Sequence, residues 1–104
     1  FYFVEKGEMT VQQYQGPLAC QVLAKDQGVC WAAYNQQQSI VVPNVHEFPG
    51  HIACDSRSNS EIVVPVFNHQ NQIVGVLDVD SQNLNSFTET DRIWLEKIVH
   101  LIFV

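Results

Sequence analysis

The sequence is poor in positive charge. Its 104 residues include 5 Lys and Arg against 11 Asp and Glu, so the formal net charge is −6. Proteins that bind a nucleic-acid backbone need basic side chains to neutralise its phosphates, so we expect no nucleic-acid partner. Charged residues make up only 15% of the chain and hydrophobic ones 46%, which is typical of one folded domain rather than a disordered chain.

Long apolar runs are also missing. No stretch approaches the ~20 residues that a membrane-spanning helix needs, and no signal-peptide pattern is present. We therefore expect no membrane partner. Residues 1–4 are apolar and predict a strand at the very start of the sequence. We interpret residues 1–104 as a single domain that lacks its N-terminal helix.

The sequence contains few cysteines, and no two of them lie close together in the chain. The three residues, Cys20, Cys30 and Cys54, include no C-x-x-C pair. An odd count does not fit the disulfide framework of a small secreted domain, and we expect a cytoplasmic protein. Zinc is disfavoured, because His51 and Cys54 lie close in sequence but no cysteine pair nucleates a structural site. Any one cysteine could be an inert buried thiol; three that converge on one loop would indicate chemistry.

What the chain does contain is a long polar loop that leads into an apolar hairpin. Residues 44–60 hold two of the four histidines together with Cys54, Asp55 and Arg57. Loops longer than about 12–15 residues are often functional in compact domains. The runs 62–67 and 72–80 that follow are rich in Val and Ile, which predicts two antiparallel strands.

The hairpin predicts an acidic cluster. A turn centred on His69 and Gln70 places Glu61 opposite Asp78, and Asp80 shares their face because side chains two apart on a strand point the same way. Neither strand contains Lys or Arg. The three carboxylates therefore indicate an external cation, and we expect one of them to hold a proton near neutral pH. The alternative is a solvated strand end, where Asp often precedes a loop.

The other segments complete an α+β domain, a central antiparallel sheet flanked by helices. Further strands are expected over 9–14 and 40–42, and a short apolar segment over 18–23. A helix over 29–34 would place Cys30 in its first turn, where the helix dipole favours a thiolate.

The last segment predicts a second helix. Thr88 is suited to be its N-cap, with Asp91 three residues later as in a capping box. The helix carries a wide apolar stripe, which we expect to pack on the sheet: Trp94, Leu95, Ile98, Val99, Leu101 and Ile102.

Several motifs together resemble one family. The string NVHEFPGHIACDSRSNSEIVVPVF, the later IVGVLDVDS and FTETD, and the earlier YQGPLAC and GVC are similar to the GAF-domain free methionine-(R)-sulfoxide reductases. The resemblance spans nearly the whole chain. It implies a GAF-like sheet flanked by helices, a homodimer, reduction of free methionine-R-sulfoxide, and recycling by thioredoxin. It implies no metal or organic cofactor.

The resemblance also implies residue roles. Cys54 matches the nucleophile that becomes a sulfenic acid, Cys20 the principal resolving cysteine, and Cys30 a third redox cysteine. The acidic set that binds the substrate corresponds to Glu61, Asp78 and Asp80. His51 and Arg57 are the local cations available to activate the nucleophile.

The chain departs from the family pattern directly after Cys30. The family usually has Gly there, whereas this sequence has Trp31, and its ring is expected to narrow the pocket or alter disulfide geometry. The alternative function is a non-catalytic GAF domain that senses a small molecule, because the hairpin and the last helix fit that equally well. The three cysteines and three acids together favour the enzyme.

Overall fold

The computed structural model describes residues 1–16, 20–50 and 57–102. The predictions made for His51, Cys54 and Asp55 lie outside these residues. Within them, six strands form one sheet in the order β3-β2-β1-β6-β5-β4, and every neighbouring pair is antiparallel. The strands are β1 (Tyr2–Glu5), β2 (Glu8–Val11), β3 (Val22–Leu23), β4 (Ile40–Val42), β5 (Ser60–Phe67) and β6 (Ile73–Ser81).

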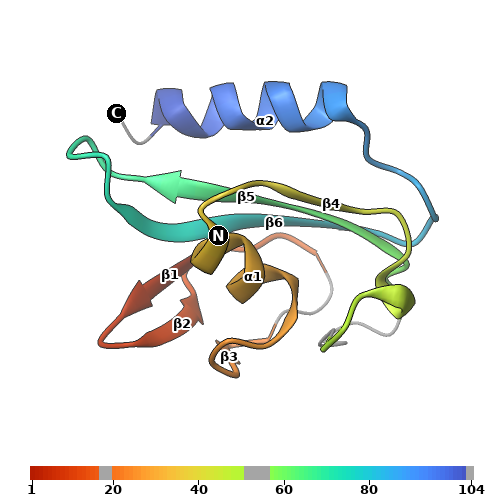
Figure 1. The fold of residues 1–104 in the computed structure, drawn as a ribbon, viewed down its shortest axis with the longest axis horizontal. Coiled ribbons are helices and arrows are strands. Elements are labelled where there is room, and N and C mark those ends of the chain that lie inside the picture. The colour runs from red at the N-terminus through yellow and green to blue at the C-terminus, as the bar shows by residue number, and fades with distance from the viewer. Residues whose placement is uncertain (17–19, 51–56, 103–104) are drawn as a thin grey trace.

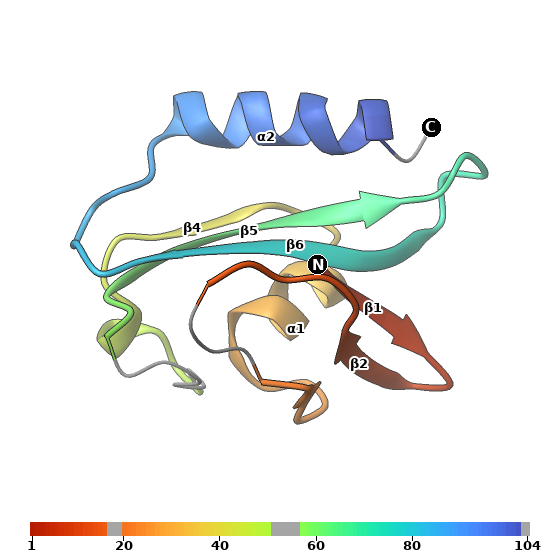
Figure 2. The ribbon, with the colours of Figure 1, turned by 180° about the vertical axis from the view of Figure 1, so that it is seen from behind.

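Two helices cover opposite faces of this sheet (Figure 1). Helix α1 spans Gly28–Gln36 and helix α2 spans Glu89–Ile102. The view from behind shows the same three layers, with α1 beside the β1–β2 hairpin and α2 above β5 and β6 (Figure 2). The α+β architecture expected from the sequence is therefore confirmed.

Element boundaries differ modestly from the sequence predictions. The second strand ends at Val11 instead of residue 14, and helix α1 extends at both ends beyond the expected 29–34. The loop 44–60 is not wholly irregular, because a 3-10 turn, η1, spans Val45–Glu47 and β5 already begins at Ser60. Asn44 caps η1 by accepting a hydrogen bond from the His46 amide at 3.1 Å.

The core is divided by the sheet into two clusters because side chains alternate along each strand. On the α1 side, Val63 and Val76 pack with Val29 and Trp31 of the helix. On the α2 side, the intervening β5 side chains pack with Val99: Ile62, Val64 and Val66. This alternation directs the side chain of Glu61, two residues before Val63, to the α1 face.

The hairpin register differs from the predicted one. Glu61 lies directly opposite Asp80, and Asp78 lies opposite Val63. The turn is one residue longer than expected, so Phe67 pairs with Ile73, and a bulge between Val66 and Phe67 shifts the pairing by one more residue. The total shift of two residues is even, so each side chain keeps its predicted face.

Helix α2 begins as predicted but packs less fully. The Asp91 carboxylate accepts a hydrogen bond from the Thr88 amide at 2.8 Å, which is the reciprocal half of a capping box. Val99 is buried and Leu95 is partly buried against the sheet. The expectation that the whole stripe packs there is wrong, because the remaining described members face outward and are exposed: Trp94, Ile98 and Leu101.

Among the described residues, no helix is long and apolar enough to cross a membrane.

Candidate active site

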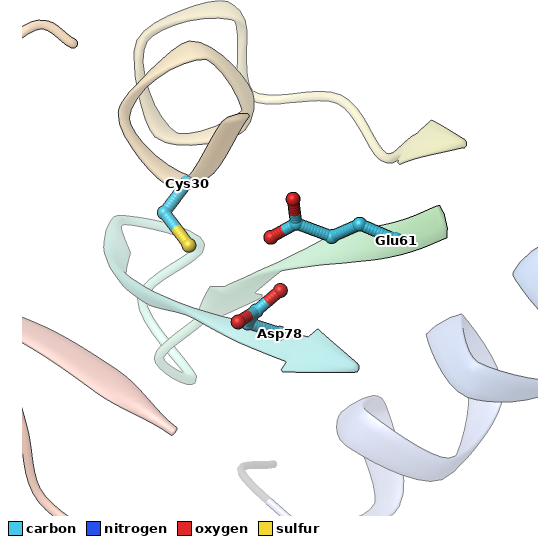
Figure 3. Close-up of side chains that lie close together, drawn as sticks. All are labelled: Cys30, Glu61 and Asp78. Atoms are coloured by element: carbon cyan, nitrogen blue, oxygen red, sulfur yellow. The ribbon is translucent and has the colours of Figure 1, made fainter. Parts of the chain in front are cut away.

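Three reactive side chains converge between α1 and the sheet. Cys30 comes from α1, Glu61 from β5 and Asp78 from β6, and each offers one atom that lies within 4.8 Å of the others. Figure 3 shows the Cys30 thiol and the two carboxyl groups pointing toward one another. Cys30 is 7% exposed and Glu61 is 5% exposed. The structure thus joins a thiol and two acids that are far apart in the sequence.

Each member is positioned by its element. Cys30 lies near the start of α1 between Val29 and Trp31, both buried in the core under the sheet. Glu61 and Asp78 are diagonal neighbours across β5 and β6, since their direct partners are Asp80 and Val63. The predicted acidic cluster is therefore present, but Glu61 and Asp78 are not directly opposite each other. Asp80, at the outer end of the face, is exposed.

Burial changes the protonation of the two acids. Burial is the largest cause, and together with the negative charge of Asp80 it raises the pKa of Glu61 to about 7, although a hydrogen bond with Asp78 opposes the shift. Burial also raises the pKa of Asp78 well above its usual range, with Glu61 adding to the effect. Within the described residues, the Oδ1 atom of Asp78 is buried without a hydrogen-bond partner. The cluster thus retains a proton near neutral pH, as the sequence indicated.

The thiolate expected at Cys30 is not favoured. Burial raises the pKa of the Cys30 thiol well above its usual value, and the charges of Asp78, Glu61 and Asp80 raise it further. The first turn of a helix favours an anion by only a modest amount at an exposed site. Desolvation and three nearby carboxyl groups outweigh that effect here. Cys30 is a free thiol that stays protonated at neutral pH.

Tyr2 belongs to the same environment and was not anticipated. Its β1 position pairs with Val76, two residues before Asp78, and its side chain is 6% exposed. Burial, Asp78 and Cys30 raise the pKa of the Tyr2 phenol, so the hydroxyl remains a hydrogen-bond donor. The strand over residues 1–4 was predicted, but its pairing with β6 was not.

The two described cysteines are in different states. Cys20 is half-buried against the α1-side core and is disulfide-bonded, whereas Cys30 is free. Arg57 is exposed. His51 and Cys54 lie outside the described residues, so activation of the Cys54 sulfur by His51 or Arg57 stays a prediction.

The chain entering β5 is anchored beside the cluster. Asn59, two residues before Glu61, contacts the His46 ring at 2.9 Å and donates to the Gln82 carbonyl at 2.6 Å. Ser60 is fully buried and donates to the Asn83 carbonyl at 2.5 Å. These contacts fix the start of β5 to the end of β6, and so hold Glu61 next to Asp80.

The donor set of the cluster would suit a cation. A thiolate with two carboxylates fits a borderline metal ion such as Zn²⁺. The sequence argument against zinc considered only cysteine and histidine spacing, so it did not consider this set. The same carboxylates suit an organic ammonium group, which can donate hydrogen bonds to each of them.

Comparisons with known proteins agree with the fold. A sequence model of the family described as "GAF domain" matches residues 1–103. The chain is 48% identical over 103 residues to GAF domain-containing protein A of Dictyostelium discoideum, covering 98% of this chain and 65% of that protein. It is 42% identical over 99 residues to the free methionine-R-sulfoxide reductase of Escherichia coli, covering 95% and 59% respectively.

A solved structure gives the same result. The chain superposes with a TM-score of 0.92 and 41% identity on the free methionine-R-sulfoxide reductase from Neisseria meningitidis in complex with its substrate, covering 97% of this chain and 61% of that one. The chain therefore spans less than two thirds of the length of these relatives. The match to the family's sequence model nevertheless extends over almost all of its 104 residues. This chain belongs to the GAF domain family.

Proposed function

We propose that this chain carries the active site of a thiol-dependent reductase that converts free methionine-R-sulfoxide to methionine. The observation that carries the proposal is the buried convergence of Cys30, Glu61 and Asp78. Relatives named free methionine-R-sulfoxide reductase, at 38% and 42% identity, support it. A GAF domain that only senses a small molecule has no need of a thiol held against two protonatable acids.

The acidic face accounts for a free amino acid as the substrate. An ammonium group that is enclosed by Glu61, Asp78 and Asp80 offsets their mutual repulsion and satisfies the buried Asp78 oxygen. A peptide has an uncharged amide nitrogen at this position and a chain that continues outward. The cluster therefore favours the free amino acid over a methionine sulfoxide residue in a protein.

The same cluster can supply the proton that the reaction needs. In the proposed chemistry, the Cys54 thiolate attacks the sulfoxide sulfur, and the oxygen receives a proton from a neutral carboxyl group of the cluster, directly or through water. Methionine leaves with its sulfur reduced by two electrons, and the oxygen ends on the Cys54 sulfur as a sulfenic acid. The raised pKa of Glu61, about 7, suits it to this donation near neutral pH.

Resolution then follows from a second thiol. The Cys20 sulfur attacks the sulfenic sulfur, the S–S bond forms, the S–O bond breaks, and the oxygen leaves as water. A thioredoxin-type dithiol would return two electrons by thiol–disulfide exchange. The disulfide at Cys20 and the free thiol at Cys30 support this order. Cys30 is buried with a raised pKa, which suits a reserve thiol better than the attacking group.

Assembly and location follow the resemblance. We infer a cytoplasmic homodimer, and the outward face of α2 supports a protein contact because it carries exposed Trp94, Ile98 and Leu101. Light scattering of the full-length protein tests the dimer.

The decisive experiment is a turnover assay on the full-length protein with a thioredoxin recycling system. It compares the R and S epimers of free methionine sulfoxide with the same epimers inside a short peptide. We expect turnover of the free R epimer alone. Comparable turnover of the peptide-bound R epimer would contradict the role of the acidic face. Binding of a small molecule without turnover of any sulfoxide would instead indicate a sensing domain.

A further inference from the structure

Trp31 connects helix α1 to the strand that follows Cys20. Its indole Nε1 donates a hydrogen bond to the Leu23 backbone carbonyl at 3.2 Å, and the bond is buried. The side chain is only 2% exposed and Leu23 is 6% exposed. The Tyr34 ring contacts the indole edge-on, with 5.4 Å between ring centroids and 79° between ring planes. The orientation of the indole is thus fixed by Tyr34 on α1 and by the hydrogen bond to Leu23 in β3.

Apart from the disulfide at Cys20, the described residues give the segment that Trp31 holds few other attachments. β3 is two residues long, lies at the edge of the sheet, and pairs with β2 only through Val22 and Leu23. The Gln21 carbonyl accepts one further hydrogen bond from the Val11 amide at 2.9 Å. A strand this short has little stability of its own. Its position therefore depends on each remaining contact.

The connection between β3 and α1 is held at a second, exposed point. The Asn35 side chain donates to the Asp26 carboxylate at 2.9 Å, and Asp26 has a left-handed backbone with φ of 62°. An exposed hydrogen bond competes with water and contributes less than a buried one. The buried bond from Trp31 to Leu23 is the stronger restraint of the two.

We propose that Trp31 is a positioning residue that holds the Cys20 segment against α1 for the resolving step. This inference rests on the proposed function, and it goes beyond it by assigning a role to the residue after Cys30. Cys20 is three residues before Leu23 and packs on the core cluster that contains Trp31. A shift of β3 would move the Cys20 sulfur relative to oxidised Cys54. Formation of a disulfide requires close and specific geometry, whereas release of methionine precedes it and does not involve Cys20.

The test separates these two steps. Trp31→Phe keeps an aromatic ring and removes the N–H donor. In a single-turnover experiment without thioredoxin, the full-length variant should release its first equivalent of methionine at the wild-type rate. Its disulfide, followed by thiol trapping and mass spectrometry, should form about tenfold more slowly, because small misplacements of reacting groups cost large factors in rate. A residue that only fills the core would change thermal stability without separating the two rates.

The chain offers a matched control in its other tryptophan. Trp94 is 58% exposed on α2, on the opposite side of the sheet. Trp94→Phe makes the same chemical change there, and both rates should stay at their wild-type values. Should Trp31→Phe fail to fold, benzothienylalanine at position 31, with sulfur in place of the indole N–H, keeps the ring volume and removes only the donor.

The outcomes are distinct. An unchanged methionine burst with slowed disulfide formation supports the proposal. The proposal is overturned if a folded variant that lacks the N–H donor carries out both steps at their wild-type rates. It is also overturned if both steps slow by the same factor. If the wild-type protein releases no methionine from free methionine-R-sulfoxide, the proposed function itself fails. The wild-type protein therefore tests the proposed function, and the Trp31 variant tests the positioning role in the same assay.

Discussion

Glu61 lies directly opposite Asp80 across β5 and β6, whereas Asp78 lies opposite Val63. Glu61 and Asp78 are thus diagonal neighbours, and their carboxyl groups still approach each other and the Cys30 thiol. Three acids on one face are costly unless a proton or a cation offsets them.

The stability of the protein should fall as the pH rises toward 7. The pKa of Glu61 is about 7 in the folded state against an ordinary value of 4.5. Between these values the folded state holds a proton that the unfolded state has released, so the advantage is full at low pH and is lost as the pH rises through 7. The raised pKa of Asp78 acts in the same direction. We expect a loss on the order of 3 kcal/mol from Glu61, measured by urea unfolding between pH 5 and pH 8.

Glu61→Gln is the control for this pH dependence. The amide cannot titrate, so the decline in unfolding free energy between pH 5 and pH 8 should become shallower. A wild-type protein whose stability increases over this range would contradict the placement of a buried, protonated Glu61.

Neutralising Asp80 should weaken turnover while leaving the fold intact. Asp80 is exposed, and Asp80→Asn keeps its shape, so the unfolding free energy should change by no more than about 0.5 kcal/mol. A hydrogen bond to a charged group contributes about 1.5–3 kcal/mol, so kcat/KM should fall roughly 10- to 100-fold. Glu8→Gln, an equivalent change at the exposed first residue of β2, should leave kcat/KM unaltered. Equal activity of both variants would remove Asp80 from the substrate site.

The three cysteines should separate in a single-turnover assay. Cys54→Ser should release no methionine, because the attacking sulfur is absent. Cys20→Ser should still release one equivalent, because resolution follows the chemical step. Cys30→Ser should retain both the burst and a disulfide at Cys20, since the Cys30 thiol is buried with a raised pKa. The methionine released per enzyme is quantified by chromatography.

The cysteine assignment has a clear opposing result. A full burst in Cys54→Ser together with its loss in Cys30→Ser would move the nucleophile to helix α1. Such a result would require substrate binding to lower the pKa of the Cys30 thiol strongly, against its burial and the nearby acids.

Gly75 should be indispensable for the position of β1. A Cβ atom at this site would meet the Tyr2 carbonyl oxygen and the Phe3 side chain, because β1 pairs closely with β6 there. Gly75→Ala should therefore destabilise the fold by about 3 kcal/mol, the upper end for overpacking. It should also weaken substrate binding, since Tyr2 enters the cluster from β1. Urea unfolding and KM measure the two effects; an unfolding free energy equal to wild type would show that β1 can move away.

Much of the site followed from local sequence. The predicted hairpin turn put Glu61 on the face of Asp78, and the separation of Asp78 from Asp80 by one residue put both on one side. The predicted register was wrong by two residues, owing to the longer turn and the bulge at Val66. The faces were still right, because a strand repeats every two residues and an even shift returns each side chain to its own side.

The sequence also determined the class of fold and the elements themselves, because helix and strand periodicity and turn residues act over short distances. Only the tertiary structure decided the protonation of Cys30. Its place near the start of α1 suggested a thiolate, but packing against Glu61 and Asp78 removes water and adds negative charge. The tertiary structure also brought Tyr2 into the cluster through the pairing of β1 with β6, and it left Trp94 of α2 exposed. Desolvation and non-local pairing depend on which distant segments meet, and no local pattern encodes them.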